Sequence, residues 1–330
     1  MKKFSIVLTL LICLSISIAS FGCSCKKDNN LIRVNEVTHS IFYAPLYVAI
    51  NNGYFEEEGI TIELTNAGGS DASMTALLSG SADISLMGPE TVVYVANQGK
   101  KNHPVVFGQL TKKDGSFLVG RNPEPNFNWS SLKGKHIIAG RKGGSPAMSL
   151  QLGLENKGYN IEKDLNFDLS IAFNMTVAAF TGGTGDYVTV FEPTASELVR
   201  NGKGYIVDSV SNASGEIPFT SFCATQSYLS DNKSLCERFL KAVMKGYNFL
   251  INTDDKGIIN SLKNSFPDSS DESIIASVKS YIKIDAWCST PVLTESLFNN
   301  LQNMLENAGE LTNRVDYSKV VNTTIAKSIK

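Results

Sequence analysis

Two stretches of the chain repeat one pattern. Residues 80–91 read GSADISLMGPET, and residues 183–194 read GTGDYVTVFEPT. Each runs from a glycine through two small residues to an aspartate, continues with strand-forming residues, and closes on a Pro/Glu pair and a threonine. Asp83 and Asp186 fix the spacing at 186 − 83 = 103 residues. Because domains usually contain about 100 to 200 residues, this spacing predicts two lobes built to one plan.

Segments of strand length alternate with helical patterns over much of the chain. In the first series, strands are expected at 31–37, 60–65, 83–87 and 104–110, with helices at 45–55, 71–80 and 89–99. In the second series, strands are expected at 135–140, 166–171, 186–191 and 204–210, with helices at 146–158, 174–183 and 193–202. This alternation is typical of βα units around parallel sheets. Gly80 and Gly183 are expected to end helices in the left-handed conformation.

After residue 227 the pattern changes to helices alone, expected at about 233–252, 254–265, 271–283 and 292–308. Such helices need a sheet to pack on, so the strand 219–225 is expected to return the chain to the first lobe. The predicted organisation is a first lobe at 31–115, a second lobe at 116–218 and a return to the first lobe at 219–330. The crossings near 111–119 and 214–225 are expected to form a hinge.

The N-terminus has the pattern of a secretion signal, with Lys2 and Lys3 before an apolar run. Gly22 directly precedes Cys23, which resembles the lipobox of bacterial lipoproteins, although Ser20 departs from the aliphatic residue usual there. The run is short and rich in serine for the alternative, a transmembrane anchor. The prediction is a signal peptide at 1–22, lipidation of Cys23, and an anchor and tether at 23–30.

Charge and motifs exclude several functions. The net charge is −2, and basic residues cluster no further than in pairs outside the N-terminus, which argues against a nucleic-acid partner. The chain has no GxSxG, HExxH or phosphate-loop motif, and only three histidines. A glycosidase-like pair of carboxylates stays open, but nothing nominates one. We therefore expect no enzyme, no metal and no cofactor.

The cysteines that follow the predicted lipidation site give no metal pattern. Cys25, Cys223, Cys236 and Cys288 are widely spaced and form no CxxC pair. Core or free thiols are the default expectation for them, and a single disulfide stays open.

The segment SIFYAPLYVAINNGYFEEEGITIEL, followed by ALLSGSADIS, resembles the type 2 periplasmic binding proteins of ABC importers. The resemblance is to the group that includes sulfonate, taurine, nitrate and thiamine-precursor binders, which is related to fungal pyrimidine-precursor synthases. It implies two α/β lobes that close over a small ligand without catalysis. It also implies a permease and its ATPase as partners and a monomeric, extracytoplasmic protein. The lipobox pattern at Cys23 adds the expectation that this protein is lipid-anchored to the bacterial cell membrane. The cysteine-rich motif of the fungal synthases is missing.

Ligands of open parallel sheets bind beyond the carboxyl ends of the strands, where loops lead into helices. When two such lobes face each other, the loops of both line the cleft between them. Such loops supply candidate ligand-binding residues, which are Ser70, Asp71, Pro89, Glu90, Ser116, Gly144, Ser145 and Asn174. In GGSPAM at 143–148, free N–H groups at a helix start favour an anion or a carbonyl oxygen, with a plain helix cap as the alternative.

Glu192 is the sharpest candidate. Pro193 keeps it out of helical geometry, and glutamate is a poor N-cap, so a ligand amine or amino-heterocycle is expected to satisfy its carboxylate. The alternative is a salt bridge to Arg141 or Lys142. Glu90 has a lesser claim, because acids are common in a first helical turn.

Three further candidates precede the first helix. Phe42 and Tyr43 could stack on a flat ligand or fill the junction between strand and helix, and filling is the expectation for Tyr43. His39 could hydrogen-bond either the ligand or the hinge. Because Asp71, Glu90 and Glu192 all fall on rim loops, the preferred ligand is an amino-bearing heterocycle of the thiamine-precursor kind. The alternatives are a sulfonate, taurine or nitrate binder, and a ligand sensor that docks on a membrane partner.

Overall fold

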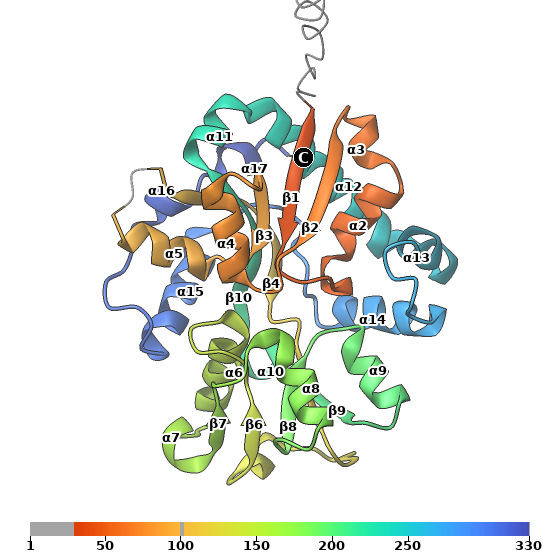
Figure 1. Ribbon diagram of the computed structural model, residues 1–330, viewed down its shortest axis with the longest axis vertical. Coiled ribbons are helices and arrows are strands. Elements are labelled where there is room, and N and C mark those ends of the chain that lie inside the picture. The colour runs from red at the N-terminus through yellow and green to blue at the C-terminus, as the bar shows by residue number, and fades with distance from the viewer. Residues whose placement is uncertain (1–29, 100–101, 330) are drawn as a thin grey trace, which may run out of the picture. The chain divides into compact units, whose positions relative to one another are not determined.

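In the computed structural model, which describes residues 30–99 and 102–329, the strands form two five-stranded sheets of one plan (Figure 1). The predicted signal peptide, the lipidation site Cys23, Cys25 and the tether up to residue 29 lie outside the described residues. Residues Ile32–Lys330 form one compact unit. The mixed α/β fold with two lobes is the fold class predicted from the sequence.

The first sheet has the strand order β2-β1-β3-β10-β4. Its strands are β1 Leu31–Glu36, β2 Thr61–Asn66, β3 Ile84–Met87, β4 Pro104–Lys113 and β10 Glu216–Thr225. β1 and β3 are parallel, with Val34 opposite Ile84, whereas β10 runs antiparallel to both β3 and β4. The carboxyl ends of β1 and β3 therefore meet at one edge of this sheet.

The second sheet has the order β7-β6-β8-β5-β9. Its strands are β5 Phe117–Gly120, β6 His136–Ile138, β7 Asn166–Asp168, β8 Tyr187–Val190 and β9 Tyr205–Ser209. β6 is parallel to β7 and β8, and β5 is antiparallel to β8 and β9. In each sheet, then, the fourth strand is an antiparallel one that the chain enters just after crossing from the other lobe.

The repeated aspartates make the same pair of backbone hydrogen bonds in both sheets. Asp83 Oδ2 accepts from the N–H of Arg33, and the Asp83 N–H donates to the Arg33 carbonyl. Asp186 Oδ2 accepts from the N–H of His136, and its own N–H donates to the His136 carbonyl. Each aspartate thus joins the start of the third strand to the start of the second. Gly80 and Gly183 precede them with φ of +76° and +106°, which confirms the predicted left-handed glycines.

Helices cover the faces of both sheets. Up to residue 200 they are α2 Ala44–Asn51, α3 Tyr54–Glu57, α4 Ser70–Ser79, α5 Glu90–Asn97, α6 Ser145–Asn156, α7 Ile161–Asp164, α8 Thr176–Thr181 and α9 Thr194–Arg200. Later helices are α10 Ser211–Ser214, α11 Gln226–Asp231, α12 Lys233–Asn252, α13 Asp255–Leu262, α14 Asp271–Lys283, α15 Glu295–Asn307, α16 Tyr317–Val320 and α17 Thr323–Ala326. Short 3₁₀ helices are η1 Ile41–Tyr43, η2 Trp129–Leu132 and η3 Phe173–Met175.

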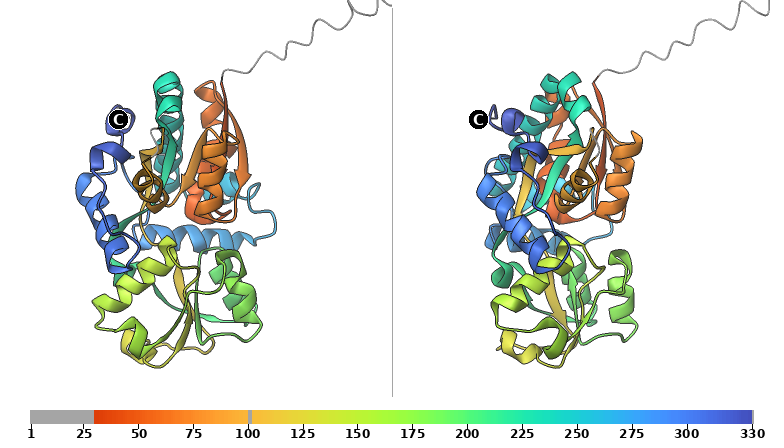
Figure 2. Two further views of the ribbon diagram at one scale, coloured as in Figure 1. Left: turned by 60° about the vertical axis from the view of Figure 1, so that its left-hand side comes forward. Right: turned by 90° about the vertical axis from the view of Figure 1, so that its left-hand side faces the viewer.

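The long C-terminal helices have clear local starting signals. Side chains of Asp254, Ser270 and Thr294 accept N–H groups in the first turns of α13, α14 and α15. α12 packs on α2, while α14 contacts both η1 and α9, so it lies between the lobes (Figure 2). Among the described residues no helix is long and apolar enough to span a membrane. Cys223, Cys236 and Cys288 are buried free thiols.

Asp114 lies where the chain first crosses between the sheets, after β4 and before β5. It is fully buried, and its Oδ1 accepts from the N–H of Ser116, while Oδ2 has no partner within the described part of the chain. Burial raises the pKa of Asp114 to about 7, and the nearby hydroxyls of Ser116 and Ser149 lower it by less. This crossing therefore carries a carboxyl group that titrates near neutral pH.

Asp114→Asn is expected to flatten the pH dependence of stability. Between about pH 4 and pH 7 the folded protein holds a proton that the unfolded chain has lost, so the free energy of unfolding falls as the pH rises through this window. From pH 5 to pH 8 the loss from this group is about 2 to 3 kcal/mol. Urea unfolding of the unaltered protein and of Asp114→Asn at pH 5 and pH 8 measures this loss. The other titrating groups affect both proteins equally, so their contribution cancels in the difference. Equal pH dependence in both would contradict the raised pKa.

Candidate functional site

A cavity of about 50 Å³ lies between the two lobes. The first lobe lines it with the ends of β1 and β3 and the starts of α4 and α5, and the second lobe lines it with the loop before α6 and with residues near η3 and β8. Its lining residues are Val37, Thr38, Tyr43, Gly69, Ser70, Gly88, Glu90, Ala139, Gly140, Arg141, Gly144, Ser145, Pro146, Ala147, Phe173, Phe191, Phe219 and Thr220. The cavity thus lies at the carboxyl ends of parallel strands in both sheets, where α/β folds bind ligands.

Five of the residues predicted from the sequence line this cavity: Tyr43, Ser70, Glu90, Gly144 and Ser145. Its aromatic walls are Tyr43, Phe173, Phe191 and Phe219. Phe219 and Thr220 come from the crossing strand β10 and were not expected, because nothing in the sequence of a strand that is buried on both faces distinguishes the residues that face a cavity. Phe173 and Phe191 lie beside predicted loop residues and carried no separate signal.

Two helix starts face the cavity without a side-chain cap. Gly69 precedes α4 and Gly144 precedes α6, and neither glycine can cap the helix with a side chain. Ser145 Oγ is buried and has no hydrogen-bond partner among the described residues, whereas Ser70 Oγ accepts from the N–H of Gly88. First-turn N–H groups attract electronegative atoms. The cavity therefore offers donors from both lobes.

Glu90 is the buried acid of the cavity. It is the first residue of α5 and only 1% exposed. Burial raises the pKa of Glu90, and the nearby Ser145 and Arg141 lower it by less. Neither carboxylate oxygen has a hydrogen-bond partner in the part of the chain that the structure describes. Glu90, which the sequence ranked below Glu192, is thus the acid whose carboxylate oxygens can still accept hydrogen bonds from a ligand.

Contacts across the cavity mouth join the lobes. Arg141 pairs with the exposed Asp71 at 3.2 Å, and Lys142 Nζ lies 3.8 Å from Glu310 Oε1. The hydroxyl of Tyr94 donates to the carbonyl of Gly143 at 3.2 Å. Asp71 therefore holds Arg141 at the rim and does not line the cavity itself.

Glu192 lies just after β8, as expected, but a protein side chain already satisfies its carboxylate. Its carboxylate accepts from the N–H and the hydroxyl of Ser196 at 2.9 and 2.8 Å, so it caps α9 from the residue before the N-cap Pro193. The longer side chain of glutamate reaches the third residue of the helix, which is why the rule for N-cap residues underrates it. The alternative, a salt bridge to Arg141 or Lys142, is wrong, because these pair with Asp71 and Glu310.

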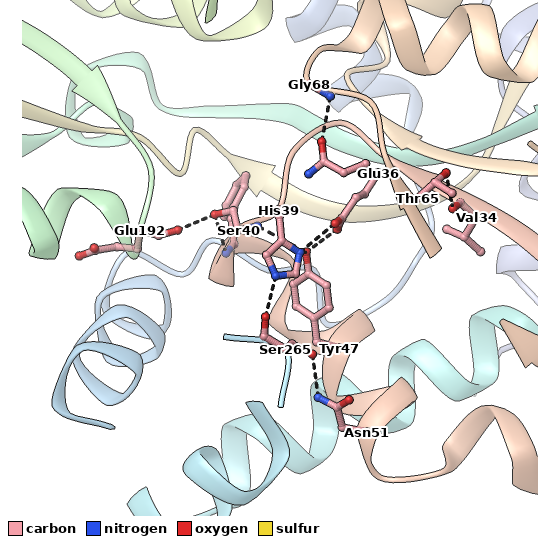
Figure 3. A network of polar contacts seen from close by, with 12 residues as sticks. Val34, Glu36, His39, Ser40, Tyr47, Asn51, Thr65, Gly68, Glu192 and Ser265 are labelled. Carbon is pink, nitrogen blue, oxygen red and sulfur yellow. Dashed lines mark hydrogen bonds and ion pairs between the residues drawn. The ribbon is translucent and has the colours of Figure 1, made fainter. Parts of the chain in front are cut away.

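A second cavity of about 260 Å³ adjoins the first and shares Thr38, Phe173 and Phe191 with it. Three predicted residues line it: His39, Asn174 and Glu192. The backbone of Glu192 joins the lobes here. Its carbonyl accepts from Ser40 Oγ at 2.6 Å (Figure 3). Its N–H donates to Tyr281 Oη at 2.9 Å.

His39 is held by protein groups at both ring nitrogens. Nδ1 lies 2.9 Å from Glu36 Oε1, and Nε2 lies 2.7 Å from the Ser265 carbonyl (Figure 3). The Tyr47 hydroxyl donates to the same Glu36 carboxylate. The hydrogen bond to Glu36 raises the pKa of His39 most, although partial burial opposes it. Neither nitrogen is left for a ligand, which corrects the first of the two expectations for His39.

Three predicted residues are buried outside both cavities. Phe42 packs against aromatic rings, Pro89 is the N-cap of α5, and Ser116 lies beside Asp114 at the crossing. Phe42 follows the buried Ile41 in a 3₁₀ turn that directs it into the core rather than toward the cavity. Position on a junction loop therefore did not distinguish a cavity wall from a core residue.

Comparisons with known proteins agree with this geometry. The sequence model of the family described as NMT1/THI5 like matches residues 41–256. YtlA from Bacillus subtilis (strain 168), whose name describes it as a binding protein, is 40% identical over 308 residues, which are 93% of this chain and 92% of YtlA.

Two solved structures share the fold. The alkanesulfonate-binding protein SsuA from Xanthomonas axonopodis pv. citri, bound to MOPS, is 16% identical with a TM-score of 0.72, covering 90% of this chain and 99% of SsuA. The desulfurization enzyme DSZB is 12% identical with a TM-score of 0.62, covering 91% of this chain and 98% of the enzyme. At these identities the likeness concerns the fold alone, and the fold serves both binding proteins and an enzyme.

Proposed function

The chain belongs to the NMT1/THI5-like family, and we propose that it is the extracytoplasmic solute-binding protein of an ABC importer. In this role it closes its lobes over a small molecule and delivers it to a permease and its ATPase. The observation that carries the proposal is the cavity enclosed by both lobes. Lipidation of Cys23 anchors the protein to the cell membrane, and it acts as a monomer.

The ligand we propose is a small, flat heterocycle that carries an amino group, such as a pyrimidine precursor of thiamine. Four aromatic side chains from both lobes and the crossing strand form the walls of the cavity. Aromatic walls favour flat ligands, because ring faces pack well on one another. A carboxylate inside an apolar cavity favours a ligand with N–H donors.

An oxyanion is the second candidate. The glycine-capped starts of α4 and α6 favour a sulfonate or a nitrate, because helix N-termini attract negative charge. The acid in the cavity opposes this alternative, since Glu90 and an oxyanion repel each other unless Glu90 is protonated. The two ligand classes thus call for opposite charge states of one residue.

Ligand-induced closure tests the binding role. The arrangement in which Arg141 pairs with Asp71 is, on this proposal, the ligand-bound one, and the ligand-free protein opens by hinge rotation. The melting temperature of the full chain in mild detergent is measured by intrinsic fluorescence, with 4-amino-2-methylpyrimidine, taurine or nitrate added. A ligand at a hundred times its Kd adds about 2.7 kcal/mol of stability. Small-angle scattering is expected to show that the protein is more compact with the bound ligand than without it.

Uptake separates the importer from a sensor. Cells that lack the protein are expected to lose uptake of the compound that raises the melting temperature. Unchanged uptake, together with ligand-induced closure, would assign the binding to signalling. Turnover of the compound by the purified chain would instead support an enzyme.

A further inference from the structure

We infer that Glu90 is the residue that determines ligand specificity, and that it accepts two N–H donors from one edge of the ligand. This inference rests on the proposed function, because it assigns chemistry to the same cavity. Among the acids predicted from the sequence, Glu90 alone combines a place in the lining, near-complete burial and two oxygens without a partner among the described residues. Asp71 is exposed at the rim, and Glu192 is held by Ser196.

The carboxylate of Glu90 lies against the backbone of Gly88. A Cβ atom added to Gly88 would lie 2.0 Å from Glu90 Oε2 and 2.5 Å from Oε1, so the carboxylate folds back over the bare backbone of Gly88. Its position at the start of α5 lets the helix dipole stabilise a negative charge. In the described lining no donor meets its oxygens with good hydrogen-bond geometry, although the hydroxyl and the N–H of Ser145 lie near enough to lower its pKa. Burying two carboxylate oxygens without hydrogen-bond donors costs free energy. A ligand that donates hydrogen bonds to them removes this cost when it binds.

The charges of the site favour the same occupant. The charged residues of the lining are Glu90 and Arg141, and Asp71 already neutralises Arg141 at 3.2 Å. The three together leave one negative charge, which is the buried one on Glu90. A cationic or donor-rich ligand compensates this charge, whereas an oxyanion adds a second negative charge in a poorly solvated space.

The size of the cavity limits the recognised group. About 10 to 15 Å³ holds one water molecule, so the cavity of about 50 Å³ accommodates a handful of non-hydrogen atoms. A planar edge with two N–H groups pairs with the two oxygens of one carboxylate. The chemical class is therefore an amidine-type edge, as in an amidinium or in an amino group beside a protonated ring nitrogen.

Acetamidine and acetate provide a matched pair of probes, because both are planar and of equal size but of opposite charge. Calorimetric titration of the full chain in mild detergent at pH 7.5 is expected to give at least ten-fold tighter binding of acetamidine. Glu90→Gln is expected to weaken acetamidine binding by ten-fold or more. Glu162→Gln, an exposed acid on α7 outside both cavities, is expected to leave it unchanged.

Two further readouts exclude a merely structural effect of the substitution. Glu90→Gln is expected to melt no lower than the unaltered protein, because it removes a buried charge that has no partner. Acetamidine affinity is expected to rise with pH as Glu90 loses its proton, whereas an oxyanion held by protonated Glu90 would bind more tightly as the pH falls.

Four results would overturn the inference. They are no binding of acetamidine at tens of millimolar, tighter binding of acetate or nitrate, an unchanged affinity in Glu90→Gln, or a loss in Glu192→Gln with none in Glu90→Gln. None of them touches the importer role, which the uptake experiment tests independently. Conversely, normal uptake in cells without the protein would reject the importer role while leaving the specificity of Glu90 intact.

Discussion

Gly246→Ala is expected to lower the free energy of unfolding by about 2 kcal/mol, although alanine is the better helix former. Gly246 lies within α12, where this helix packs on α2. A Cβ atom at this position would lie 2.2 Å from the Pro45 carbonyl oxygen and 3.1 Å from the Ala49 nitrogen. Both neighbours are backbone atoms, so no side chain can rotate away and the two helices must separate. Urea unfolding measures the loss.

Asn248→Ala is the matched control on the same helix. Asn248 is exposed, so helix propensity alone decides the outcome there, and a gain of a few tenths of a kcal/mol is expected. The opposite signs at 246 and 248 separate close packing from propensity. A Gly246→Ala variant that is as stable as the unaltered protein would show that α12 and α2 separate without cost.

Much of the architecture could be predicted from the sequence, because periodic patterns fix the type of an element. The helices expected at 233–252 and 271–283 are α12 and α14 with those bounds. The echo of Asp83 and Asp186 predicted lobes of one plan, and the shared hydrogen bonds to Arg33 and His136 give its physical reason.

Short elements escaped prediction because tertiary contacts form them. β5 has only four residues and lies within a crossing that was expected to serve as a hinge. It becomes a strand because β8 and β9 offer hydrogen-bonding partners on both sides. Helices of four residues, such as α10 and α16, are too short to show a helical period.

The site was harder to predict than the fold. Loop position at strand ends correctly brought Tyr43, Ser70 and Ser145 to one cavity, because topology alone places such loops together. The sequence ranked Glu192 above Glu90, and it could not reveal the reverse order, since that depends on whether a neighbour satisfies each carboxylate. Ser196 satisfies Glu192, and no described residue satisfies Glu90.

Phe42→Ala is expected to lower the free energy of unfolding by about 3 to 5 kcal/mol. The Phe42 ring is fully buried, with ring centroids of Tyr281 at 5.0 Å and of Phe191 at 5.5 Å. Tyr281 lies on α14 and Phe191 follows β8, so the ring fills the junction between the lobes. Chemical unfolding followed by fluorescence measures the loss.

Phe249→Ala supplies the control, because Phe249 is only partly buried on α12 and a smaller loss is expected there.

The Phe42 substitution also decides between the two roles that the sequence left open for an aromatic residue at this junction. A core residue loses stability and keeps the preference among ligands, because Phe42 supports the walls Phe191 and Phe219 from behind and does not itself face the ligand. A residue that stacks on the ligand would lose affinity while the unfolding transition stays where it was. Since no atom of Phe42 lines the cavity, the first outcome is the expected one.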